Sequence, residues 1–166
     1  KARLKGFTPK QNRERPRLDY DLVYRFKTAF PELTVSINGG VADLDAAKDH
    51  LRHVDGVMIG RAAYGDPYML ARADQEIFGE QTPVVSGTDA VRAMMPYLRK
   101  QTESGVRPHA VTRHWLNLFK GRAGAAAWRR TLTEASLAPD ASFKTVAEAV
   151  NKVISSVENH LSENTL

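Results

Sequence analysis

The sequence contains no cysteine. This absence excludes a disulfide framework, a thiolate zinc site and any cysteine nucleophile or proton donor within these 166 residues. The sequence also lacks an apolar run of the ~18 residues that a membrane span requires, and no apolar signal core follows the basic residues at its start. We therefore expect a cytoplasmic protein without a membrane segment.

The composition is that of a folding chain. Hydrophobic residues make up 42% and charged residues 26% of the sequence, so the chain has enough apolar side chains to bury a core. The length of 166 residues is nevertheless well short of the ~250 that a closed eight-stranded α/β barrel usually needs. One ordinary domain or two small ones are expected.

The charge is distributed in blocks. Residues 1–30 contain nine Lys or Arg and three acids, and residues 31–90 contain four Lys or Arg and ten acids. Residues 91–130 contain nine Lys or Arg and one acid, whereas residues 131–166 contain two and five. Two basic blocks on either side of an acidic one favour contact with a polyanion, because phosphates attract clustered cations. A solvated basic face without a ligand is the alternative.

The first half of the sequence alternates between helical and strand-like patterns. Apolar spacing predicts an amphipathic helix over 19–30, and short β-branched or apolar runs predict strands at 33–37 and 54–59. Helices are predicted at 43–51 and from Asp66 to Phe78. Repeated strand–helix units indicate a parallel sheet with helices outside it, as in an α/β barrel or a doubly wound sheet.

The second half is helical in its periodicity. Residues 81–88 are typical of a linker, and a second, all-helical domain is predicted over 89–166, after an α/β portion at 1–80. Pro96 is expected to kink or interrupt the first helix of this domain. Its helices are predicted as a small bundle over 89–103, 108–119, 124–136 and 143–161.

Two glycine-containing turns follow the predicted strands at matching positions. Asn38, Gly39 and Gly40 end the first strand, and Gly60 and Arg61 end the second. Glycines allow backbone N–H groups to approach an anion, a helix N-terminus adds positive partial charge, and an arginine adds a charge-assisted hydrogen bond. We therefore predict a phosphate-binding cradle. The alternatives are ordinary βα turns, and an Arg61 that pairs with an acid such as Asp66.

Several segments, in order and at their spacing, resemble the flavin-dependent tRNA-dihydrouridine synthases, most closely the A-type subfamily. These segments are KARLKGFTPKQNR at 1–13, INGG at 37–40, DGVMIGR at 55–61, VTRH at 111–114 and WRR at 128–130. The resemblance runs from residue 1 to about residue 153.

This resemblance implies a fold and an activity. The family combines an FMN-binding (β/α)8 TIM barrel with a small helical-bundle domain, so this chain would hold the last two βα units and the helical domain. NADPH reduces FMN, the flavin transfers hydride to C6 of a D-loop uridine (20 or 20a), and a cysteine protonates C5 to give 5,6-dihydrouridine. The family's catalytic cysteine is expected upstream of this chain, which by itself would be inactive.

The resemblance also implies roles for individual residues. Contacts to the phosphate and ribityl group of FMN are expected from Asn38, Gly39, Gly40, Gly60 and Arg61. Contacts to tRNA are expected from Lys10, Arg13, Arg113, Arg129 and Arg130. One departure is visible: Ala126 occupies a position where the subfamily usually has a tRNA-binding arginine.

Other candidate residues favour structural roles. His114 is expected to be packed or hydrogen-bonded, and Trp115 and Trp128 are expected to anchor the core. His50 and His53 have no third ligand, so no metal site is expected. A monomer is expected. Two alternative functions are a phosphate-binding barrel enzyme acting on a small metabolite and a non-catalytic RNA-binding module.

Overall fold

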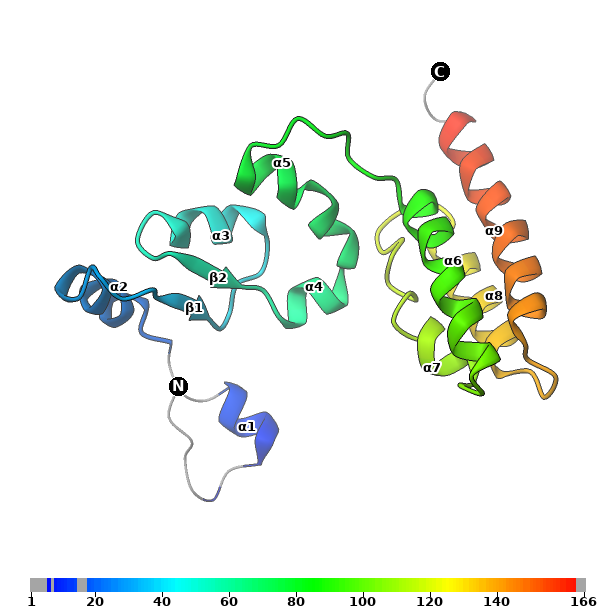
Figure 1. Cartoon of the computed structure of the whole chain (residues 1–166), viewed down its shortest axis with the longest axis horizontal. Coiled ribbons are helices and arrows are strands. Elements are labelled where there is room, and N and C mark those ends of the chain that lie inside the picture. Colours follow the sequence, from blue (N-terminus) through cyan, green and yellow to red (C-terminus); the bar gives the residue numbers. More distant parts are fainter. Residues whose placement is uncertain (1–5, 7, 15–17, 164–166) are drawn as a thin grey trace. The chain divides into compact units, whose positions relative to one another are not determined.

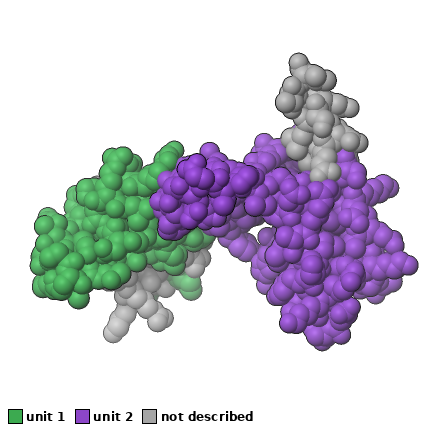
Figure 2. Space-filling model, turned by 45° about the horizontal axis from the view of Figure 1, so that its top comes forward, with its two compact units in different colours: residues 1–62 green, residues 63–166 purple. Residues whose placement is uncertain are grey.

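The chain forms two compact units, Lys1–Ala62 and Ala63–Leu166 (Figure 2). The structure, a computed structural model, describes residues 6, 8–14 and 18–163, with backbone alone for 12–14 and 156–163. In this part of the chain the fold is mixed: mainly helical, with one small parallel sheet of two strands.

The first unit is built around a strand–helix–strand arrangement. Strand β1 (Ser36–Asn38) pairs in parallel with β2 (Gly56–Met58), and α3 (Leu44–Leu51) connects them. Ile37 lies opposite Val57 in this register. Parallel strands require such a crossover, and it places the carboxyl ends of both strands at the same edge (Figure 1). The unit also contains α1 (Pro9–Glu14) and α2 (Tyr20–Ala29).

The core of this unit is small. Its buried side chains come from β1, from α3 and from the loops beside them; they are Ile37, Val41, Leu44, Ala47, His50 and Val54. The apolar members of α3 recur at helical spacing, and Asp43 caps the helix by accepting a hydrogen bond of 2.8 Å from the Ala46 backbone N–H. The local sequence therefore determines both where α3 begins and which face it buries.

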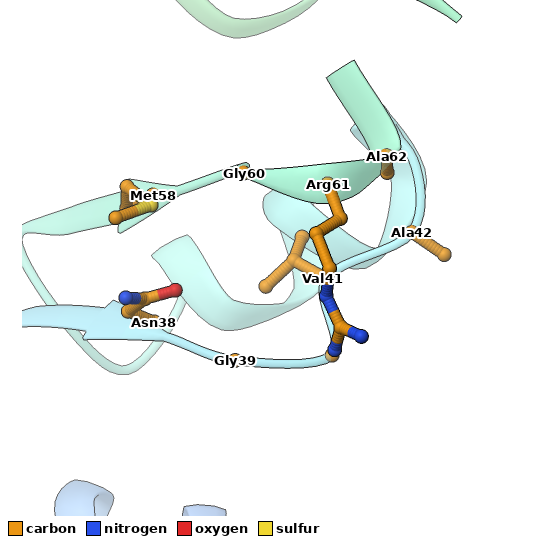
Figure 3. A pocket seen from close by; sticks show the side chains of 9 residues that line it. Asn38, Gly39, Val41, Ala42, Met58, Gly60, Arg61 and Ala62 are labelled. Carbon is orange, nitrogen blue, oxygen red and sulfur yellow. The ribbon is translucent and has the colours of Figure 1, made fainter. Parts of the chain in front are cut away.

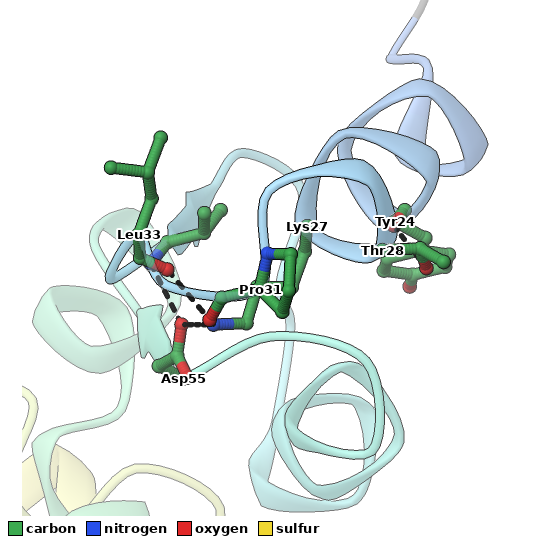
Figure 4. Close-up of polar contacts among 7 residues, drawn as sticks. Tyr24, Lys27, Thr28, Pro31, Leu33 and Asp55 are labelled. Carbon is green, nitrogen blue, oxygen red and sulfur yellow. Dashed lines mark hydrogen bonds and ion pairs between the residues drawn. The ribbon is translucent and has the colours of Figure 1, made fainter.

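A polar cluster joins the end of α2 to the start of β2. The Lys27 Nζ donates hydrogen bonds of 2.8 Å to the backbone carbonyls of Pro31 and Leu33 and lies 2.9 Å from Asp55 Oδ2 (Figure 4). The Val35 backbone N–H donates to the same Asp55 oxygen at 2.8 Å. The Val35 hydrogen bond, followed by that from Lys27, holds the pKa of Asp55 below its ordinary value.

Helix α2 leaves large apolar side chains in contact with solvent. Leu22 is 55% exposed, and Phe26 and Phe30 are each 45% exposed. These residues form the apolar stripe that the sequence predicts, yet no α2 residue is buried in the described structure. An amphipathic helix ordinarily turns such a stripe toward a core.

The second unit begins with short helical segments and continues with longer helices. After α4 (Arg61–Gly65), which ends in this unit, come the 3₁₀ helix η1 (Pro67–Arg72) and α5 (Ala73–Phe78). Four further helices are α6 (Gly87–Glu103), α7 (Pro108–Thr112), α8 (Ala125–Leu137) and α9 (Phe143–Glu163).

Helices α6 to α9 and the segment between α7 and α8 share one hydrophobic core. Its buried members are Val91, Leu98, Val111, Trp115, Phe119, Trp128, Leu132, Val146, Val150, Val153 and Ile154. Trp128 is fully buried, its Nε1–H donates a hydrogen bond of 2.9 Å to the Trp115 carbonyl, and its ring meets Phe119 edge-on with centroids 4.9 Å apart. The expectation that Trp115 and Trp128 anchor the core is confirmed.

The predicted helix over 108–119 is wrong beyond Thr112. The chain continues as successive turns, in which Leu118 N–H donates to the Trp115 carbonyl and Lys120 N–H to the Asn117 carbonyl. The Trp115 carbonyl also accepts from Trp128, so this tertiary contact replaces the regular helical pattern. Arg113 and Lys120 consequently lie outside a regular helix.

Other local predictions differ in smaller ways. The strands are shorter than predicted, and the turn after β2 opens α4. Helix α6 is not interrupted: it continues through Pro96, which lies on the exposed side, where water can satisfy the carbonyl that lacks its helical donor. Within the described residues, none of the helices has both the length and the apolar character needed to cross a membrane.

Candidate functional site

An open hollow of about 740 Å³ lies at the carboxyl edge of the two strands. All five residues predicted to bind FMN line it, together with neighbouring apolar residues; the five are Asn38, Gly39, Gly40, Gly60 and Arg61. They converge because both strands end at this edge and each continues into a glycine-containing turn. None of the lining residues is acidic, so the hollow suits an anion.

The Gly39–Gly40 turn requires glycine for two separate reasons. Both residues have positive φ angles, 120° at Gly39 and 72° at Gly40. A Cβ atom on Gly39 would lie 2.8 Å from Leu18 Cδ2, and one on Gly40 would lie 2.6 Å from the Tyr20 hydroxyl oxygen. Larger residues would therefore strain the backbone and displace Leu18 and Tyr20.

Tyr20 fixes the same turn from the side of α2. Its hydroxyl donates a hydrogen bond of 2.7 Å to the Gly39 carbonyl. Four residues later on α2, the Tyr24 hydroxyl lies 2.6 Å from Nδ1 of the buried His50 on α3. The two tyrosines attach α2 to the glycine turn and to the helix that follows it.

Arg61 supplies the positive charge at the hollow. Its exposed side chain extends from the start of α4 toward the loop between Gly39 and Val41 (Figure 3). It forms no ion pair with a described residue of its own unit, so its charge is not neutralised there. At the start of α3, the Asp43 cap already accepts a hydrogen bond from the Ala46 N–H, so this amide is not available to a ligand.

The residues predicted to contact tRNA lie in both units. In the second unit, Arg129 and Arg130 are exposed on α8 directly after the buried Trp128, and Arg113 is exposed just beyond α7. The buried indole therefore fixes the part of α8 that carries the two arginines. In the first unit, Lys10 is exposed on α1, whereas the side chain of Arg13 lies outside the described residues.

His114 has structural partners. The Nδ1 atom of His114 lies 3.0 Å from the Tyr64 hydroxyl, and its Nε2 accepts a hydrogen bond of 3.3 Å from Arg113 Nε. The expectation of a hydrogen-bonded His114 is confirmed. Within the described residues, no group of three or more His, Asp or Glu side chains is arranged to hold a metal ion.

Sequence reasoning missed Leu18 and Tyr20 as residues that pack against the Gly39–Gly40 turn. Leu18 precedes α2 and Tyr20 is its first residue, about 20 positions before the glycines that they contact. The available signal was the placement of Tyr20 and Tyr24 one helical turn apart, on a helix whose apolar stripe uses other positions.

Comparison with known proteins gives consistent results. The profile of the dihydrouridine synthase (Dus) family matches residues 2–158. A tRNA-dihydrouridine(20/20a) synthase of Vibrio cholerae is 47% identical over 153 residues, which cover 92% of this chain and 47% of that protein. Synthases of the same name from Salmonella typhi and Shewanella oneidensis are 52% and 50% identical over 134 residues, 81% of this chain and 40% of each relative. The chain thus spans less than half the length of these relatives.

Proposed function

The chain belongs to the dihydrouridine synthase family, and we propose that it is the C-terminal part of an FMN-dependent enzyme that reduces a D-loop uridine of tRNA. The family and its A-type subfamily agree with the resemblance seen in the sequence. The names of the relatives favour uridines 20 and 20a as the target. Ala126 leaves one expected tRNA contact to be supplied by other residues.

The convergence of five residues on one hollow carries this proposal. In α/β barrels the loops after the last two strands commonly form a phosphate site, and the two βα units here place glycines and an arginine in that position. In this assignment the backbone N–H groups of Gly39, Gly40 and Gly60 bind the FMN phosphate. Arg61 neutralises its charge, and Asn38 faces the ribityl group.

The residues fit an anionic cofactor chemically. The lining has an arginine and no carboxylate, and the glycine turn is held in shape by Tyr20. FMN, reduced by NADPH, would supply the hydride for C6 of the uracil ring. This chain has no cysteine, so the proton for C5 must come from a residue outside these 166.

The exposed apolar stripe of α2 supports a larger α/β domain around this unit. Leu22, Phe26 and Phe30 would be covered by further helices of a TIM barrel, and the matched region covers only 47% of the Vibrio cholerae relative. We accordingly assign residues 1–80 to the barrel, 81–88 to a linker and 89–166 to a helical bundle that contacts tRNA. We also keep the predictions of a monomer and a cytoplasmic location.

The tRNA surface is assigned to the basic residues of both regions. Arg113, Arg129 and Arg130 contribute three exposed cations in the helical part, and Lys10 and Arg13 contribute to the barrel part. Phosphate contacts of this kind position an RNA without reading its bases. The uridine must leave its stack to reach the flavin, so these contacts would hold the rest of the tRNA in place.

The test uses the complete protein that contains this chain. It should purify with a flavin absorption spectrum and, with NADPH, convert a uridine of an unmodified tRNA transcript to dihydrouridine. Mapping should locate the product at positions 20 and 20a. The 166-residue chain, assayed in parallel, should form no product. A complete protein without flavin and without product would contradict the proposal and favour a non-catalytic RNA-binding module.

A further inference from the structure

A second hollow, of about 500 Å³, lies in the second unit beside the end of α8. One wall is formed by α7 and the residues around it, which contribute Arg107, His109 and Arg113. The other wall is formed by the end of α8 and the loop that leads to α9, which contribute Leu137 and Pro139. The hollow shares no lining residue with the cradle at the strand ends.

Among the described residues, the arginines of the cationic wall have no ion-pair partner. Neither Arg107 nor Arg113 forms an ion pair with a described residue, and no acidic residue lines the hollow. Asp140 is exposed in the α8–α9 loop but is not part of the lining, although both of its neighbours are. Two arginines on either side of a five-residue helix create a local positive potential that attracts an anion.

The opposite wall is apolar. Leu137 is 59% exposed although it is a large hydrophobic residue, and Pro139, Ala138 and Ala141 complete the surface beside Ser136. A hollow with cations on one side and apolar groups on the other matches a molecule with an anionic group attached to a flat apolar one. Its volume of about 500 Å³ is in the range of small-ligand sites.

The hollow continues the basic surface of α8. Arg130 and Leu137 are seven residues apart, so they lie on the same face of α8, about 10 Å apart along its axis. A strand held by phosphate contacts to Arg130 could therefore reach the hollow within a few nucleotides.

We propose that this hollow binds one unstacked nucleotide of an RNA strand, with its phosphate between Arg107 and Arg113 and its base against Leu137 and Pro139. This assignment rests on the proposed function, because that function brings an RNA to this part of the chain. Single-stranded bases commonly bind proteins in this way, since their faces pack on apolar or guanidinium planes while their phosphates meet cations.

The test is a nuclear magnetic resonance titration of the 166-residue chain, labelled with ¹⁵N, using a uridine tetranucleotide as the probe. The largest amide shifts should occur at Ala110, Arg113, Ala138 and Ala141. Arg107→Ala and Arg113→Ala should each weaken binding about fivefold or more, because each removes a charge-assisted contact. Arg92→Ala is the matched control: it removes the same charge from an exposed ion pair on α6 and should have little effect.

A second pair of measurements separates a nucleotide site from a simple anion site. Leu137→Ala should weaken binding of the tetranucleotide and leave binding of inorganic phosphate unchanged. Because Leu137 is exposed, this variant should keep the wild-type spectrum away from the hollow. Equal binding of phosphate and tetranucleotide, equal effects of Arg107→Ala and Arg92→Ala, or shifts outside the hollow would each overturn the proposal.

The outcome is independent of the enzymatic assay. A complete protein that makes no dihydrouridine would refute the proposed function and leave a positive titration intact. An active complete enzyme whose hollow shows no response to RNA would refute only this assignment.

Discussion

The Tyr20 hydroxyl and the Gly39 carbonyl oxygen are 2.7 Å apart, and this hydrogen bond joins the first residue of α2 to the turn that follows β1. The two groups are separated by 19 positions in the sequence. The bond fixes the orientation of the Gly39–Gly40 peptide, whose N–H group belongs to the proposed phosphate cradle. Tyr20 is therefore a positioning residue for the cradle.

Tyr20→Phe should weaken FMN binding in the complete protein. Loss of one neutral hydrogen bond costs about 1 kcal/mol, equivalent to roughly fivefold in the dissociation constant. Equilibrium dialysis against FMN measures the effect. Tyr24→Phe is the matched control, because it removes a hydroxyl from the same helix that contacts His50 and not the turn. Equal losses in the two variants would show that Tyr20 acts only through the packing of α2.

Gly40→Ala should destabilise the chain more than Gly79→Ala. Both glycines have similar positive φ angles, 72° and 69°. The left-handed backbone conformation therefore costs an alanine the same free energy at each position, about 1–2 kcal/mol. At Gly40 the new methyl group also meets the Tyr20 hydroxyl and Leu18, whereas at Gly79 nothing lies within 4 Å. Thermal unfolding of the two variants measures the difference, and equal melting temperatures would contradict the tight packing of the turn.

Arg61→Ala should release FMN from the complete protein. Removal of the charged partner of the phosphate should cost about 2 kcal/mol, equivalent to roughly a 30-fold weaker affinity. Flavin absorbance after gel filtration reports the occupancy. Arg52→Ala removes an exposed cation that pairs with Asp49 on the same unit, and it should retain flavin. Normal flavin occupancy in Arg61→Ala would show that Arg61 does not bind the FMN phosphate.

Asp55→Asn should alter the acid sensitivity of the first unit. The pKa of Asp55 is lower in the folded than in the unfolded chain, so its ionised form stabilises the fold above about pH 4, and this stabilisation is lost as the pH falls through the folded pKa. The variant should therefore be less stable than the wild type at neutral pH, and the two should converge in acid. Thermal unfolding across this range is the measurement.

A control for this acid effect is Glu32→Gln, which changes an exposed carboxylate in the loop between α2 and β1. It should leave the pH dependence close to that of the wild type. Parallel curves for Asp55→Asn and the wild type would mean that the contacts with Val35 and Lys27 do not contribute through the charge of Asp55.

Arg129→Ala should reduce the salt dependence of tRNA binding by this chain. Each phosphate contact releases a condensed counterion, so losing one contact should lower the slope of log affinity against log salt by roughly one unit. The circular dichroism should not change, because Arg129 is exposed. Lys152→Ala, an exposed cation in the acidic C-terminal block, should do little. Equal effects of both variants would indicate diffuse charge attraction.

The convergence of the five residues on one hollow could be predicted from sequence, because they are local to two similar strand ends. Glycines after short apolar runs indicate turns, and parallel pairing brings such turns together, as Asn38 and Gly60 illustrate. Tyr20 could not be predicted in the same way, because nothing in its local pattern specifies that its hydroxyl reaches Gly39. Its role depends on the packing of α2.

The helix predicted for the segment after α7 was wrong because of a tertiary contact. Residues 108–119 have a helical apolar pattern, but the Trp115 carbonyl binds the indole of Trp128, which lies 13 positions away. The same contact determines where Arg113 lies relative to α8. The cationic hollow beside α8 therefore could not be predicted from the sequence. The exposure of the apolar stripe of α2 could not be predicted either. An amphipathic pattern predicts that one face is buried, but it does not identify the element that covers this face.

The positions of the two tryptophans provide an optical probe of one half of the molecule. Trp115 and Trp128 both belong to the second unit and the first unit has none, so indole fluorescence excited beyond the tyrosine band reports only the second unit. Trp128 is fully buried, and its emission should move to longer wavelengths when that core opens. Far-ultraviolet circular dichroism follows the helices of both units. In one denaturant titration, coincident transitions in the two signals would mean that the units unfold together, whereas separate transitions would give each unit its own stability.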